Sequence, residues 1–278
     1  MFNYKILENI AMEILHQAFV EAFSDYAVKM DLPLERFQQM LQRRGFTPEL
    51  SLGAFDGEKL VGFVFNGFRE WDGKLTVYDL GTGVVPEYRR QGITNEMLKR
   101  ITKMVKEKQA QQYLLEVLQA NVSATELYKK QGFKVVRELE CYQISASDFV
   151  PATTCIVEQI EPQQFSDFMD FTPSWQNSND SIRAVSESFS YVGVRMNDVI
   201  VGYGIIDKKT GDIPQIAVHQ KYRGQGIATS IISELIKHTE SEKVSLLNVD
   251  SQCESLKRFL VARGFTRFVD QYEMILAF

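Results

Sequence analysis

The sequence predicts an α+β protein made of two similar domains in tandem, each a mixed, mostly antiparallel, twisted sheet flanked by helices. A set of short motifs occurs twice in the same order along the 278 residues. Within each half, strand-like segments are interspersed with helical ones, which is typical of mixed sheets covered by helices. The length also suits two domains, because single domains usually have about 100 to 150 residues.

The clearest repeated motif covers residues 84–94 (VVPEYRRQGIT) and residues 218–228 (VHQKYRGQGIA). Three shorter blocks on either side also match: 59–63 with 199–203, 115–117 with 247–249, and 131–133 with 263–265. Repeats this long indicate a duplicated domain, since solenoid units have periods of about 20 to 50 residues. A polar stretch around Pro151 separates the copies. We therefore expect one domain over residues 1–146 and another over residues 155–278.

The first half is expected to open with helices. Apolar residues recur at three- and four-residue steps from Ala11 to Tyr26, and Asp31 can cap a second helix that Gly45 ends. The turn at 56–57 (Asp-Gly) favours a hairpin, and another turn at 71–73 leads to the next strand. A later apolar stripe begins at Ile93 and predicts a third helix. The expected strands of this half cover residues 50–55, 60–68, 75–85, 113–118 and 133–144, with a short helix over 124–130.

The second half repeats this order with a shorter helical opening. Its expected helix carries an apolar stripe from Ile227 to Ile236. Its expected strands cover residues 191–196, 199–206, 213–218 and 244–249.

The composition limits the class of function. The net charge of −5 and the scattered basic residues argue against a nucleic-acid-binding protein. No apolar run reaches the length of about 18 residues needed for a membrane span, and the N-terminus lacks the pattern of a secretory signal. The three cysteines and three histidines show no ligand spacing, so no metal site is expected. We expect a cytoplasmic protein without nucleic-acid or membrane partners. The sequence leaves open whether the protein forms an oligomer.

The repeated loop has the chemistry of an anion site. It is expected to lie between the end of a strand and the start of a helix, where backbone N–H groups lack internal partners and the helix dipole is positive. Such a turn can bind phosphate. Gly92 allows close approach of the backbone, and Arg89 or Arg90 can add charge-assisted hydrogen bonds. An ordinary turn with surface arginines is the alternative, although the second copy argues against it.

The motif Val-x-Pro-x-Tyr-Arg-x-x-Gly-Ile at residues 84–93 is followed by Asn121-x-x-Ala124-x-x-x-Tyr128-x-x-x-Gly132-Phe133. Together they resemble the GNAT superfamily of N-acetyltransferases, and the similarity covers most of both halves. The resemblance implies that the loop wraps the pyrophosphate of acetyl-CoA and that a backbone N–H near Val84 and Val85 binds the thioester carbonyl. Thr94 departs from the Gly or Ala of the family pattern. The resemblance marks these positions for the cofactor: Val84, Val85, Arg89, Arg90, Gln91, Gly92, Ile93, Thr94 and Asn121, with Val218, Arg223, Gly224, Gln225, Gly226, Ile227 and Ala228 in the second copy.

The catalytic candidates lie in the first half. Tyr128 matches the family tyrosine that acts as general acid near the CoA sulfur, and a core or capping aromatic on an amphipathic helix is the alternative. Glu116 and Asp79 are candidates for the general base, and for each a structural hydrogen bond is the alternative. Glu116 lies in an apolar strand, where a carboxylate usually has a specific role. Asn121 either contacts the pantetheine arm or caps a helix.

The second half lacks these groups. With Gly264 matched to Gly132, Tyr128 corresponds to Leu260, Asn121 to Cys253 and Glu116 to Asn248. We therefore expect chemistry in the first domain and a second domain with degenerate catalytic residues that can still bind a CoA-like ligand. The predicted function is transfer of an acetyl group from acetyl-CoA to a primary amine of a small molecule or peptide. A non-catalytic acyl-CoA-binding or scaffold protein is the alternative.

Overall fold

A computed structural model describes residues 2–25, 32–162 and 168–278. The chain forms two compact units. The first consists of Met1–Val117, Asn121–Val136 and Glu273–Phe278, and the second of Leu118–Ala120 and Arg137–Tyr272. In the described ranges, no helix is both long and apolar enough to cross a lipid bilayer.

The sheet of the first unit combines antiparallel and parallel pairs. Its strand order is β1-β2-β3-β4-β5-β12, in which the pairs from β1 to β4 are antiparallel and β4 and β5 run parallel. The predicted hairpin at 56–57 is confirmed, because Asp56 pairs with Lys59, and the turn predicted at 71–73 also closes a hairpin, in which Trp71 pairs with Lys74. The strands are β1 (Asn3–Ile6), β2 (Leu52–Asp56), β3 (Lys59–Trp71), β4 (Lys74–Val84), β5 (Gln112–Leu118) and β12 (Thr266–Ala277).

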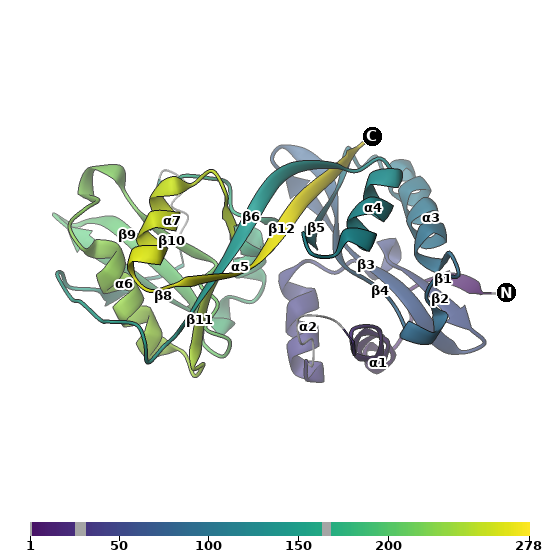
Figure 1. The fold of residues 1–278 in the computed structure, drawn as a ribbon, viewed down its shortest axis with the longest axis horizontal. Coiled ribbons are helices and arrows are strands. Elements are labelled where there is room, and N and C mark those ends of the chain that lie inside the picture. The colour runs from purple at the N-terminus through teal and green to yellow at the C-terminus, as the bar shows by residue number, and fades with distance from the viewer. Residues whose placement is uncertain (1, 26–31, 163–167) are drawn as a thin grey trace. The chain divides into compact units, whose positions relative to one another are not determined.

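Helices cover both faces of this sheet (Figure 1). Rings from the first two helices pack on one face of β3, where Phe63 and Phe65 stack at 4.3 Å. On the other face, Gly62 leaves room for Ile93 and Met97 of α3. The helices are α1 (Met12–Ala22), α2 (Leu34–Arg43), α3 (Ile93–Glu107) and α4 (Val122–Lys130).

Two of the expectations about the opening helices concern the residues at the ends of these helices. The apolar pattern from Ala11 forms α1, whereas its last residue, Tyr26, and the predicted cap at Asp31 lie outside the described residues. The N-cap position of α2 is Pro33, which makes no side-chain cap hydrogen bond. Gly45 follows α2 with φ +75°, a left-handed conformation that favours glycine after a helix.

The second unit contains the order β10-β9-β8-β7 and the set β12-β6-β11. Helix α6 packs on β9, because Gly202 and Gly204 leave room for Ile227, Ile231 and Leu235. The strands are β6 (Lys134–Ser145), β7 (Glu158–Gln159), β8 (Phe189–Met196), β9 (Val199–Asp207), β10 (Gln215–Val218) and β11 (Lys243–Asp250), and the helices are α5 (Asn179–Ala184), α6 (Ile227–Leu235) and α7 (Glu254–Ala262).

The two units are not separated at a single position in the sequence. Residues 133–144, expected to hold the last strands of the first half, form the single strand β6, which passes from one unit into the other. The chain end Glu273–Phe278 belongs to the first unit, where β12 lies beside β5. Local patterning defines a strand but not its partner, so the sequence boundary between 146 and 155 stays a prediction about the repeat.

Candidate active site

The central sheet of the first unit opens between β4 and β5. The parallel pairing ends at Asp79 and Leu115, whereas β4 continues along β3 as far as Val84. Because Val85 N–H donates to Val61 O at 2.9 Å, alternation places the N–H groups of Thr82 and Val84 on the side away from β3. The Val84 N–H thus faces the gap, while the Val85 N–H is used within the sheet.

Tyr128 and Asp79 meet at the closed end of this gap. Tyr128 Oη donates to Asp79 Oδ2 at 3.4 Å, and both side chains are 7% exposed. Tyr128 comes from α4, and Asp79 is the last residue of β4 that pairs with β5. The structure therefore brings together a buried phenol and a buried carboxylate that lie 49 residues apart in sequence.

A β-bulge at Leu80 shapes the surroundings of Asp79. Asn66 pairs with Asp79 but Phe65 pairs with Gly81, so Leu80 is the extra residue. As a result Thr82 lies on the same face as Asp79 and donates to Oδ2 at 2.6 Å, while Gly81 N–H donates to Oδ1 at 2.9 Å. Burial nevertheless raises the pKa of Asp79 from 3.8 to about 6, against these hydrogen bonds, which lower it.

A second buried tyrosine supports the site from β5. Tyr113 Oη donates to Asn66 Oδ1 at 2.7 Å, and the Asn66 amide donates to Leu50 O. Burial, and after it the charge of Asp79, raise the pKa of Tyr113 well above its usual range. The phenol of Tyr113 thus remains protonated and holds Asn66 opposite Asp79.

Glu116 lies on the other face of the sheet. Its position on β5 alternates with that of Leu115, the partner of Asp79, and matches that of Leu114, the partner of Tyr78. Burial raises the pKa of Tyr78 well above its usual range, and the charge of Glu116 adds to the shift. Of the two predicted bases, the structure therefore places Asp79 with Tyr128 and Glu116 with Tyr78.

The first loop has the predicted form but uses its first arginine internally. Gly92, with φ +79°, precedes α3, and a Cβ placed there would meet nothing within 4 Å. Arg89 donates to Val84 O, to Ala22 O and to both carboxylate oxygens of Asp25. Its guanidinium ties the loop to the end of α1.

The remaining loop residues divide by exposure. Arg90 is exposed in a left-handed conformation with φ +62°, Gln91 is exposed, and Thr94 is half-buried. The Ile93 side chain is buried in the core, so only its backbone can face a ligand. The Asn121 side chain accepts from Ala124 N–H at 3.2 Å, which is a helix cap.

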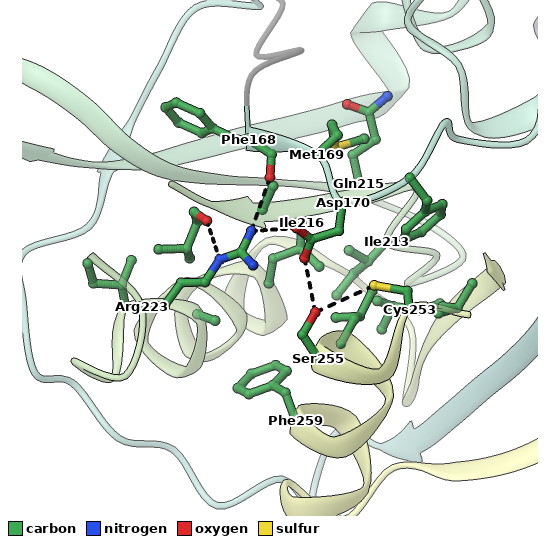
Figure 2. A pocket seen from close by; sticks show the side chains of 18 of the residues that line it. Phe168, Met169, Asp170, Ile213, Gln215, Ile216, Arg223, Cys253, Ser255 and Phe259 are labelled. Atoms are coloured by element: carbon green, nitrogen blue, oxygen red, sulfur yellow. Dashed lines mark hydrogen bonds and ion pairs between the residues drawn. The ribbon is translucent and has the colours of Figure 1, made fainter. Parts of the chain in front are cut away.

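The second loop repeats this arrangement around a cavity of about 390 Å³. Arg223 donates to Val218 O and Asp170, as Arg89 does to Val84 O and Asp25 (Figure 2). His219 N–H donates to Val201 O, so the Val218 N–H points away from β9. The cavity lies between β10 and β11 and is lined in part by Val218, Arg223, Gly224, Gly226, Ile227 and Ala228, whereas Gln225 is exposed.

The counterparts of the catalytic candidates differ in the second unit. Leu260 is fully buried in the core, and Cys253 lines the cavity. Asn248 is buried at a β11 irregularity with φ +60° and donates to Ser174 Oγ at 3.0 Å. The cavity thus has a ligand-sized volume, but the positions that match Tyr128 and Glu116 carry no phenol and no carboxylate.

Several neighbours of the site were not predicted. Thr82, Tyr113 and Asn66 are the most direct, followed by Asp25 and Asp170 on the loop arginines. A strand pattern alone places Thr82 on the face opposite Asp79, and only the bulge at Leu80 reverses this. The polar Asn66 within an apolar strand was the one available indication of a buried network.

Comparisons with known proteins agree with this geometry. Residues 11–133 match the model described as "Acetyltransferase (GNAT) family", and residues 156–274 match the "Acetyltransferase (GNAT) domain" model. A thialysine N-epsilon-acetyltransferase of Sus scrofa is 33% identical over 90 residues, which are 32% of this chain and 52% of that protein. N-alpha-acetyltransferase 30 of Schizosaccharomyces pombe is 29% identical over 102 residues, 36% of this chain and 68% of its own length. The chain spans about half the length of the first curated relatives it matches.

Solved structures share the fold of the whole chain. A tandem GNAT protein from the clavulanic acid biosynthesis pathway has a TM-score of 0.77 at 12% identity, over 100% of this chain and 98% of that one. A GCN5-related N-acetyltransferase from Sphaerobacter thermophilus has a TM-score of 0.74 at 14% identity, over 99% and 95%. With both family models matched in succession, the chain belongs to the GNAT acetyltransferases, as a tandem two-domain member.

Proposed function

We propose that the first domain transfers an acetyl group from acetyl-CoA to a primary amine of a small molecule or peptide. The contact between Tyr128 and Asp79 at the end of the opened sheet carries the proposal. It places a proton donor and a proton acceptor, both shielded from water, at one point of the site.

The first loop and the gap fit acetyl-CoA. The open space at Gly92 and the start of α3 suit a diphosphate, with the exposed Arg90 as a positive partner. The Val84 N–H faces the gap, where it can donate to the thioester carbonyl. The thioester supplies the activated acyl group, and the protein holds it and manages the protons.

The proton transfers follow from the two buried groups. With a pKa of about 6, Asp79 is mostly ionised at neutral pH and can accept the proton of an incoming ammonium. Tyr128 is neutral at that pH and can protonate the departing thiolate. Because Tyr128 already donates to Asp79, the same contact lets the pair exchange a proton between turnovers.

The relatives support an amine acceptor. Their names specify the ε-nitrogen of thialysine and an α-nitrogen, both of which are typically primary amines. A primary amine is therefore the proposed acceptor class, and the shared fold does not select one amine within it.

The test is release of CoA thiol from acetyl-CoA by the purified chain with thialysine, lysine and peptides that carry free N-termini. Amine-dependent release with acetylated product in mass spectrometry is the expected result. Acetyl-CoA binding without release across the panel would contradict the proposal and favour a non-catalytic acyl-CoA-binding protein.

A further inference from the structure

A carboxylate bridges two walls of the second-unit cavity. Arg223 Nη2 lies 2.9 Å from Asp170 Oδ1, and Ser255 Oγ donates to Asp170 Oδ2 at 3.0 Å. Arg223 belongs to the loop before α6, and Ser255 belongs to the first turn of α7. Figure 2 shows the three side chains pointing toward one another, and all three line the cavity.

The first unit uses the corresponding residues differently. Asp25 accepts from Arg89 with both carboxylate oxygens, at 2.6 and 2.7 Å. Ser123, which occupies the place of Ser255, donates instead to Asn121 Oδ1 at 3.1 Å. The serine hydroxyl therefore completes a helix cap in the first unit and a bridge in the second.

A segment of the second unit that precedes β7 also covers this loop. A Cβ placed at Gly226 would lie 2.6 Å from Thr154 Oγ1, whereas the same atom at Gly92 would meet open space. Thr154 is fixed there, because its hydroxyl donates to Gln225 O at 3.0 Å and its N–H donates to Ser230 Oγ at 2.9 Å. The glycine that gives a ligand access in the first loop is covered in the second.

We propose that the bridge from Arg223 through Asp170 to Ser255, here called the latch, closes the second-unit cavity to acetyl-CoA. While the latch is closed, the chain binds one acetyl-CoA, in the first unit. The ligand and the first site rest on the proposed function. Both loop arginines pair with a carboxylate, but only Asp170 is also held by Ser255, which keeps its negative charge at the cavity, where it repels an approaching diphosphate. Its bond to Ser255 also joins the loop before α6 to the first turn of α7 across the cavity that both line.

The first experiment is calorimetric titration with acetyl-CoA in a Gly92→Glu background, which leaves only the second site. Adding Ser255→Ala removes one bond of the bridge and keeps the pair of Asp170 and Arg223. We expect the affinity of the second site to rise about tenfold, since a hydrogen bond to a charged group is worth that factor or more. Ser123→Ala in a Gly226→Glu background is the matched control, with an affinity within about twofold of its parent.

The second experiment needs no acetyl-CoA. Cys253 lines the cavity with its Sγ 3.6 Å from Ser255 Oγ, and it is 8% exposed. In a Cys155→Ser variant, which removes the more exposed thiol, iodoacetamide labelling of Cys253 reports the opening of the latch. Asp170→Asn, which leaves Ser255 in place, and Ser255→Ala are both expected to accelerate labelling roughly tenfold.

The outcomes separate the latch from the proposed function. Labelling and second-site binding at the wild-type level in both variants, with unchanged melting temperatures, would overturn the latch. Faster labelling with acetyl-CoA bound in the first unit alone would overturn acetyl-CoA as the excluded ligand. Faster labelling with acetyl-CoA bound in neither unit would overturn the proposed function and leave the latch standing.

Discussion

Tyr128 donates its phenol proton to the Asp79 carboxylate across the end of the gap between β4 and β5. The bond is long, at 3.4 Å, whereas Thr82 donates to the same carboxylate oxygen at 2.6 Å. Thr82 and Gly81 therefore fix the orientation of Asp79, and the Tyr128 phenol can turn toward a substrate with little loss of bonding. This difference in length underlies the first prediction.

Tyr128→Phe is expected to lower kcat about 100-fold or more, which is the usual contribution of a general acid, with little change in stability. Tyr113→Phe is the matched control, because it removes another buried phenol and leaves the Asn66 carbonyl without this donor. That variant is expected to lose about 1 to 3 kcal/mol of stability and to keep most of its kcat. Thiol release and urea unfolding measure both quantities, and equal losses of kcat in the two variants would remove the assignment of Tyr128 as the acid.

The raised pKa of Asp79 predicts a pH dependence of activity. The base must be ionised, so kcat/KM is expected to rise with pH through about 6 and then level off. In Asp79→Asn the activity is low and this limb of the profile is absent. A profile with the same limb in Asp79→Asn would assign the titration to another group.

The same pKa predicts an effect on stability of the opposite sign. The folded-state value of about 6 lies above the usual 3.8, so the folded protein binds the proton more tightly than the unfolded chain. The free energy of unfolding contributed by Asp79 therefore falls as pH rises from about 4 to 6, by about 2 to 3 kcal/mol in total. Urea unfolding at pH 4.5 and 8 is expected to show Asp79→Asn gaining stability relative to wild type at the higher pH.

The two arginines of the first loop are expected to differ. Arg89→Ala breaks the ties to Ala22, Val84 and Asp25, so it lowers the melting temperature and loosens the loop. Arg90→Gly places glycine in the left-handed conformation that Gly224 has in the second copy, so stability is kept or raised. Acetyl-CoA affinity is nevertheless expected to fall about tenfold in Arg90→Gly, through loss of a charge-assisted bond. Unchanged affinity in calorimetry would remove Arg90 from the binding site.

Gly92→Glu is expected to weaken acetyl-CoA binding at least about 100-fold, because it adds a negative charge at the start of α3. Gly45→Glu is the matched control. Gly45 has φ +75° and open space around its Cβ position, as Gly92 does with φ +79°, but it follows α2. Both variants carry similar backbone strain, so a comparable loss of affinity in Gly45→Glu would show that strain rather than the loop is responsible.

The repeat, the hairpins and the position of the loops could be predicted because each depends on residues close together in sequence. The turns after Asp56 and Trp71 and the left-handed Gly92 are local features. The choice between Asp79 and Glu116 could not be made from the sequence, since it depends on register between β4 and β5 and on which face α4 covers. The position of β12 beside β5 depends on pairing between segments more than 150 residues apart, which no local pattern encodes.

Glu116 provides a test of which of the two carboxylates, Asp79 or Glu116, is the general base. It lies with Tyr78 on the face opposite Tyr128, so Glu116→Gln is expected to leave the rise of kcat/KM near pH 6 in place. We expect instead a severalfold change in the KM for the amine, with kcat within about tenfold of the wild-type value. The reason is that a carboxylate beside the gap attracts an ammonium. The pH profile of Glu116→Gln compared with that of Asp79→Asn decides the matter. Loss of the limb near pH 6 in Glu116→Gln alone would make Glu116 the base and leave Asp79 a structural partner of Tyr128.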